Sequence, residues 1–171
     1  MEFSTYELAL QKYASKIKTT PTPLNSWDFH SANFYTFKNS IADTIELSKL
    51  ATSNNWNQNW NLQAKLQNET IIVVTDVDLK IVFASKNIVK MNGYLPSEVI
   101  GQHPKMFQGE ATNLETSKEI GFAIKNQKPF KKVITNYCKD GSLYKCEIHG
   151  FPIFNQSGSL INFIAFEKMV A

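Results

Sequence analysis

Apolar residues in the first part of the chain recur at the spacing of a helix. Steps of three and four residues line one face of a helix, and they predict a first helix with the stripe Phe3, Tyr6, Leu10, Tyr13 and Ile17. Pro21 and Pro23 then exclude helix, because each lacks an amide donor and constrains the residue before it. We expect a turn or an extended link there.

A second helical pattern covers residues 31–53. Its predicted packing stripe consists of Phe34, Phe37, Ile41 and Ile45, widened by Leu47 and Leu50. The two predicted helices could form an antiparallel hairpin. The Asn-rich residues 54–61 follow, Trp56 and Trp60 are spaced by one helical turn, and Leu62 and Leu66 continue the apolar spacing. This spacing predicts a short linker helix whose tryptophans dock on the neighbouring domain.

The periodicity changes at Thr70 to short strand-like runs. Residues 71–74 and 80–83 predict a hairpin, and helical pieces are expected at 85–91, 96–100 and 113–126. Three more strands are expected at 130–138, 144–153 and 160–167. This order predicts an α+β fold: a five-stranded antiparallel sheet with short helices on one face and a pocket between the layers. We set the boundaries at 1–67 for an N-terminal helical extension and 68–171 for the sheet domain.

Composition and charge narrow the function. The net charge is +3, no run of five like charges occurs, and every basic residue is Lys, so nucleic acid is not an expected partner. The first residues lack the basic and apolar regions of a signal peptide, and no apolar run is long enough to span a membrane. We therefore expect a cytoplasmic protein. Cys138 and Cys146 are the only cysteines and are expected to be reduced, separate thiols.

One segment carries a family resemblance. Residues 84–101 contain Asn87, a Gly93-Tyr94 turn, Ser97 and Glu98 near a helix start, and then Gly101. This pattern resembles the first half of PAS domains, and the second half also agrees at Pro129-Phe130, Asn136, Asp140-Gly141, Pro152-Ile153, Gly158 and Phe163. The resemblance covers about residues 70–167. It implies the PAS fold and a role in sensing or signal transduction.

Within that family the chain looks nearest to the light-sensing LOV branch. There a segment like residues 101–109 holds the photoreactive cysteine, and this chain has Pro104 in that place. The resemblance also implies that His103, Cys146 and Glu167 replace two Asn and one Gln of a flavin site, whereas Asn136 and Gln108 are retained. Buried flavin atoms without partners are costly. We therefore predict a colourless protein with no cofactor.

Haem, metal and catalytic sites are not expected either. None of His30, His103 and His149 lies on the long helix where the family resemblance would place a haem ligand. No spacing of His, Cys or carboxylates suits a metal, and no set of nucleophile, base and orienting residue appears. The sequence therefore predicts a protein that is not an enzyme.

Two hypotheses for function remain. In the first, a small apolar ligand enters the pocket and changes the packing of the N-terminal helices. The predicted pocket residues are Phe83, Ile88, Met91, Met106, Phe107, Phe122, Ile134, Asn136, Cys146, Ile148 and Phe163. In the second, those side chains close the pocket and the chain is an interaction module. A flavin-binding photoreceptor is the least favoured alternative.

The expected partners are a second copy of the chain and a signalling protein. PAS domains commonly self-associate through helices that flank the sheet, so we predict homodimerisation through residues 1–66. Packing of the first apolar stripe on the second helix or on the sheet is the alternative. Since residues 168–171 directly follow the last predicted strand, we expect the signal to leave by contact.

Overall fold

The computed structural model describes residues 25–58, 60–67 and 70–170, and for residues 25–36 and 67 it describes only the backbone. The predicted first helix therefore lies outside the described residues. Two units divide the chain, Met1–Tyr35 and Thr36–Ala171. The second unit contains the whole sheet, the short helices and helix α2 from Thr36 onward.

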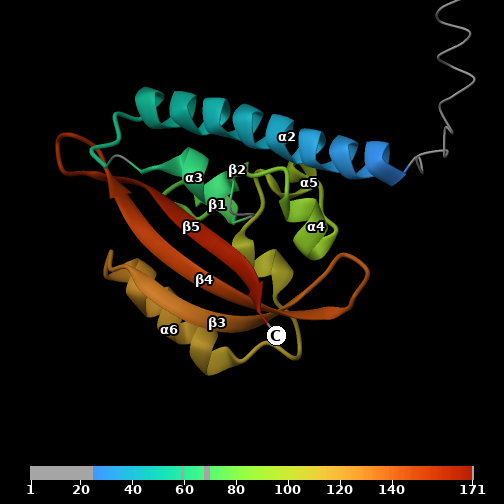
Figure 1. Cartoon of the computed structure of the whole chain (residues 1–171). Coiled ribbons are helices and arrows are strands. Elements are labelled where there is room, and N and C mark those ends of the chain that lie inside the picture. The colour runs from blue at the N-terminus through green and yellow to red at the C-terminus, as the bar shows by residue number, and fades with distance from the viewer. Residues whose placement is uncertain (1–24, 59, 68–69, 171) are drawn as a thin grey trace, which may run out of the picture. The chain divides into compact units, whose positions relative to one another are not determined.

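Five antiparallel strands form one sheet in the order β2-β1-β5-β4-β3 (Figure 1). Their bounds are β1 Ile71–Thr75, β2 Ile81–Ala84, β3 Phe130–Tyr137, β4 Leu143–Phe154 and β5 Leu160–Val170. All five were predicted, and the α+β class with a single antiparallel sheet is confirmed. The turn between β3 and β4 uses Gly141 at φ 86°, where a residue with a side chain would be strained.

Four short helices connect β2 to β3. They are α4 Ile88–Asn92, α5 Pro96–Val99, the 3₁₀ helix η1 Pro104–Phe107 and α6 Leu114–Lys125. The sequence predicted three of them and missed η1, in which Pro104 occupies the first turn and the His103 side chain caps the start by accepting from the Lys105 amide. η1 brings Phe107 into the core.

The two faces of the sheet carry separate core clusters. On the helical face, Ile71, Val73 and Ile134 pack with Ile88, Met91 and Val99. On the opposite face, Ile72, Val74 and Phe166 pack with Leu47, Leu62 and Leu66. Residues before Asn68 therefore contribute to the same hydrophobic interior as the sheet.

Helix α2 spans Asn25–Ser53, so it begins six residues before the predicted start, soon after Pro23. The predicted packing stripe was wrong for Phe37, Ile41 and Ile45, which are 52%, 40% and 52% exposed, but right for Leu47, which is buried, and Leu50, which packs against the core. Ser40 and Asp43 join Leu47 on the buried face. Polar residues can occupy this buried face because the protein supplies hydrogen-bond partners for them.

The segment after α2 also differs from the prediction. The described residues of 54–61 form no helix, whereas the part of the predicted linker helix that contains Leu62 and Leu66 is helical: α3 covers Leu62–Gln67. Trp56 makes an isolated bridge with Asn155, and its indole nitrogen donates to Asn162 Oδ1 at 3.0 Å. Trp60 packs on Phe151 and Phe166. The tryptophans thus dock on the sheet as expected, but they do so from an irregular segment.

Candidate functional site

A cavity of about 600 Å³ lies on the helical face of the sheet. Strands β1, β3, β4 and β5 supply one side of it, and η1 and α6 supply the other. Its apolar walls include Val73, Phe107, Ile120, Phe130 and Phe163. The predicted pocket between the two layers is therefore present, and the protein's own side chains do not fill it.

The alternation of β5 determines which side chains reach this cavity. Phe163, Ala165 and Glu167 share one face, and Ala165 and Glu167 pair with Gly150 and Ile148 of β4. Gly150 leaves room for its neighbour, because a Cβ atom there would lie 2.3 Å from the Phe130 ring. A residue larger than glycine at position 150 would displace this wall of the cavity.

Glu167 is the acidic group that lines the cavity, and its side chain is 7% exposed. Burial raises the pKa of Glu167 to about 7, and a hydrogen bond from Cys146 partly offsets that effect. The Cys146 Sγ lies 3.6 Å from Glu167 Oε2. Burial also raises the pKa of the Cys146 thiol, and the neighbouring Glu167 adds to that rise.

Two further buried polar groups line the cavity, and both have an unpartnered atom. The Asn136 Oδ1 and the Thr75 Oγ1 have no hydrogen-bond partner, although the residues are only 4% and 6% exposed. Near Asn136, burial raises the pKa of the Tyr144 hydroxyl, hydrogen bonds from Asn92 and Asn136 oppose the rise, and the charge of Glu167 adds to it. Tyr144 lies opposite Asn136 in the pairing of β3 with β4.

Lysines stand on the helical side of the cavity. Lys105, Lys118 and Lys125 belong to the lining, together with His103. Burial, followed by the charges of Lys105 and Lys80, lowers the pKa of His103. The lining thus has exposed cationic residues on its helical side and a buried carboxyl group on the sheet.

The structure distributes the eleven predicted pocket residues over four places. Phe107, Asn136, Ile148 and Phe163 line the cavity. Ile88, Met91, Met106, Ile134 and Cys146 belong to the adjacent core cluster. Two assignments are corrected: Phe83 lies in the core cluster on the opposite face of the sheet, and Phe122 is 68% exposed.

The predicted pocket residues omitted Thr75, Phe130 and Glu167, which line the cavity, although the family resemblance had placed Glu167 at a flavin-site position. The alternation of β5 from Phe163 contained the signal for Glu167, since residues two and four positions later share a face. Within the described chain, no three His, Cys, Asp or Glu side chains gather in a group that could hold a metal ion. Nor does any described helix have both the length and the apolar character needed to cross a membrane.

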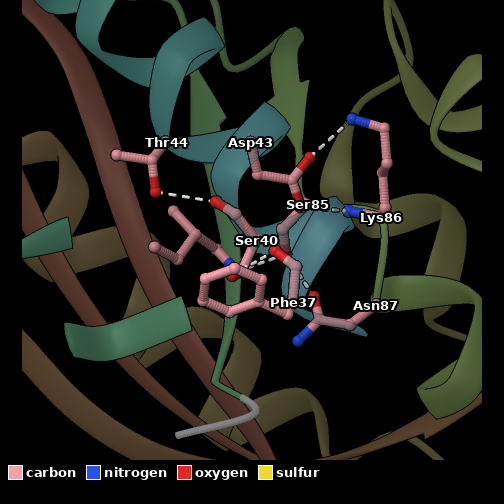
Figure 2. A network of polar contacts seen from close by, with 8 residues as sticks. Phe37, Ser40, Asp43, Thr44, Ser85, Lys86 and Asn87 are labelled. Atoms are coloured by element: carbon pink, nitrogen blue, oxygen red, sulfur yellow. Dashed lines mark hydrogen bonds and ion pairs between the residues drawn. The ribbon is translucent and has the colours of Figure 1, made fainter. Parts of the chain in front are cut away.

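A second polar cluster joins α2 to the start of α4 (Figure 2). The Asp43 carboxylate accepts from the Lys86 amide at 2.8 Å and from Lys86 Nζ at 2.9 Å. Beside it, the Ser85 hydroxyl accepts from the Ile72 amide and donates to Asn87 Oδ1. These contacts explain why the buried face of α2 carries a carboxylate.

Comparison with known proteins identifies the family. The sequence profile of the PAS domain matches residues 68–168. The chain belongs to the PAS domain family. This match covers strands β1 to β4 and all of β5 except its last two residues.

The relatives of this PAS domain include light receptors. It is 40% identical over 92 residues to Protein TWIN LOV 1 of Arabidopsis thaliana, covering 53% of this chain and 23% of that protein. It is 34% identical over 88 residues to a blue-light-activated histidine kinase of Brucella canis, covering 52% and 18%. The chain thus spans less than a quarter of the length of either relative.

Solved structures of LOV domains share the fold. A light-oxygen-voltage domain studied with a flavin analogue aligns with a TM-score of 0.61 at 24% identity, over 66% of this chain and 87% of that one. The light-state Aureochrome1 LOV domain aligns with a TM-score of 0.57 at 23% identity, over 59% and 81%. This PAS domain is therefore LOV-like in both sequence and fold.

The lining residues do not fit the flavin chemistry of the LOV branch. Pro104 lines the cavity, and no cysteine occurs among the described residues that do so. The thiol of Cys146 is directed to Glu167, and that of Cys138 to the Met91 carbonyl. A cysteinyl-flavin bond therefore has no thiol to form from. The resemblance to the LOV branch also implies an amide at position 167, where this chain has the buried carboxyl group of Glu167.

Proposed function

We propose that this chain is a non-catalytic PAS sensory module that binds a small organic ligand in the cavity beneath the sheet. The observation that carries the proposal is the combination of apolar walls with unpartnered, buried Asn136 Oδ1 and Thr75 Oγ1. A buried polar atom without a partner costs about 1–3 kcal/mol, and a bound ligand would offset that cost. Light receptors among the relatives support a role in signal transduction.

Native mass spectrometry of protein purified from cells tests this function. We expect an additional small-molecule mass that is released on denaturation. Ala165→Leu should abolish it, because Ala165 lines the cavity and a larger side chain would fill the space. Phe122→Leu is the matched control, since that exposed side chain does not line the cavity, and it should retain the mass.

Three outcomes of that experiment differ in meaning. A mass that Ala165→Leu removes supports the sensor. Absence of any bound mass in repeated preparations rejects it and favours the interaction module without ligand. A flavin mass with a yellow preparation would support the photoreceptor alternative in a form without the cysteinyl bond.

We also propose that the signal leaves through contact between two copies of the chain along α2. Phe37, Ile41 and Ile45 follow one another at intervals of four residues, so they form one exposed apolar stripe. A stripe of this kind on a helix suits a self-complementary, two-fold contact. The opposite side of the same helix is tied to Lys86 by Asp43. α2 could thus connect the sheet domain with its partner.

A further inference from the structure

The polar groups that face the cavity from the sheet are mainly acceptors. The Asn136 Oδ1 is an acceptor without a partner, and Thr75 Oγ1 is likewise unpartnered. The hydrogen bond that Glu167 receives comes from the Cys146 thiol at 3.6 Å, and a thiol is a weak donor. Asn136 Oδ1 and the ionised Glu167 carboxylate therefore offer acceptors that a ligand with N–H donors would satisfy, and the Thr75 hydroxyl can donate or accept.

Asn136 and Glu167 face the same cavity from two strands of the sheet. Asn136 lies on β3 opposite Tyr144 of β4, and its side-chain oxygen has no partner. Glu167 lies on β5 opposite Ile148 of β4, which also lines the cavity. A single ligand in the cavity would therefore face both side chains.

Resting on the proposed sensory function, we propose that the cavity selects a small organic base, with a flat apolar body and an amidine-like edge that donates N–H groups to Glu167 and Asn136. A planar edge with two N–H donors matches a carboxylate in a bidentate geometry. The apolar body would contact Phe130 and Phe163. Charge pairing also resolves the burial of an acid, because a cation stabilises the ionised form of Glu167.

The lysines limit how this ligand can be charged. Lys105, Lys118 and Lys125 line the helical side, so a second positive group there would be repelled. An organic acid is the opposite case: it could pair with these lysines, but it adds no donor for Glu167 or Asn136. An organic base would therefore bind to the sheet side of the cavity, at Glu167 and Asn136, and an organic acid to the lysines on the helical side.

Titration with naphthamidine and naphthoate distinguishes them, because the two probes share a flat apolar body and differ in the polar group. We expect calorimetry and amide chemical shifts to detect naphthamidine binding near β5, with naphthoate much weaker. Glu167→Gln should weaken naphthamidine binding by about tenfold or more, because a charge-assisted contact is lost. Glu147→Gln is the control, since Glu147 pairs with Lys131 and does not line the cavity; its affinity should match that of the unchanged protein.

Two results would overturn the inference: tighter binding of naphthoate than of naphthamidine by the unchanged protein, or equal naphthamidine affinity in Glu167→Gln. Circular dichroism verifies that each variant folds, and Asn136→Leu offers a second variant that should also weaken naphthamidine binding. If naphthamidine does not bind while native mass spectrometry finds a bound mass that Ala165→Leu removes, the proposed ligand class is wrong and the sensory function is still supported. If naphthamidine does not bind and no bound mass is found, the sensory function is rejected as well.

Discussion

Glu147 and Glu167 lie on neighbouring strands and behave in opposite ways. Glu147 lies 3.1 Å from Lys131 Nζ, and this partner, together with His149, lowers its pKa. Burial raises the pKa of Glu167 to about 7, and Lys131 and His149, which contact Glu147, do not contribute there. The same side chain is therefore an ordinary ionised surface acid in one position and a proton-holding buried acid in the other.

Glu167→Gln should change how the stability of the protein depends on pH. Because the folded pKa of Glu167 is above the unfolded value of 4.5, the folded state holds the proton more tightly, and its advantage is lost as pH rises from 4.5 to about 7. Urea unfolding should show a decrease of about 3 kcal/mol over this window that the Gln variant lacks. Glu147→Gln should retain the decrease. Identical pH profiles for the unchanged protein and Glu167→Gln would contradict this prediction.

Individual residues could be predicted where strand alternation is regular. Asn136, Ile148 and Phe163 were correctly assigned to the cavity because β3, β4 and β5 alternate without interruption around them. Phe83 was assigned to the wrong face, because the β1–β2 register shifts between Val74 and Thr75 and a local shift of this kind leaves no sequence signal. Phe122 failed for a different reason: its helical position does not say which side of α6 meets the sheet.

Helix α2 shows how a favourable polar partner can outweigh an apolar pattern. Its apolar pattern predicts a buried face that includes Phe37, Ile41 and Ile45, yet these side chains are exposed, and Asp43, at 2% exposure, is buried together with Leu47. The Lys86 amide and ammonium groups both donate to it, and the desolvated carboxylate is thereby satisfied (Figure 2). The strands and most helices were predictable from periodicity, whereas the buried face of α2 includes a carboxylate whose partner lies 43 positions away.

Asp43→Ala should destabilise the fold by about 1–3 kcal/mol, because it leaves the Lys86 amide without an acceptor. Chemical denaturation measures the free energy of unfolding, and hydrogen exchange at the Lys86 amide should accelerate. Glu46→Ala is the control, since Glu46 is exposed on the same helix, and it should change stability by less than about 0.5 kcal/mol. Equal effects of the two substitutions would mean that the Asp43 contact carries no net stabilisation.

On the scale of the molecule, the sheet separates the cavity from a second hydrophobic layer. Leu47, Leu62 and Leu66 complete that second layer, so the interior of the sheet domain depends on residues before Asn68. A chain that starts at Asn68 would expose Ile72, Val74 and Phe166. Loss of a dimer on such a truncation would therefore say little about the dimer contact itself, and point substitutions are the better test.

Homodimerisation through α2 predicts that Phe37→Glu combined with Ile41→Glu gives a monomer by light scattering, whereas the unchanged chain is a dimer. Charges in an apolar contact between two copies are costly because they lose their hydration. Leu114→Glu, on the exposed surface of α6, should leave the dimer intact. A monomeric unchanged chain, or a double variant that remains dimeric, would reject the α2 contact.

Strand β5 contributes side chains to the hydrophobic layers on both faces of the sheet. Glu167 lines the cavity, while the preceding residue, Phe166, packs with Trp60 on the opposite face and lies under the Lys65 ammonium group. Glu167, which lines the cavity, and Phe166, which belongs to the aromatic cluster, are therefore joined by one peptide bond. Because the two residues are adjacent, a backbone rotation that moves Glu167 also moves Phe166. The environment of the Trp60 indole would therefore change with the contents of the cavity, although Trp60 does not line that cavity.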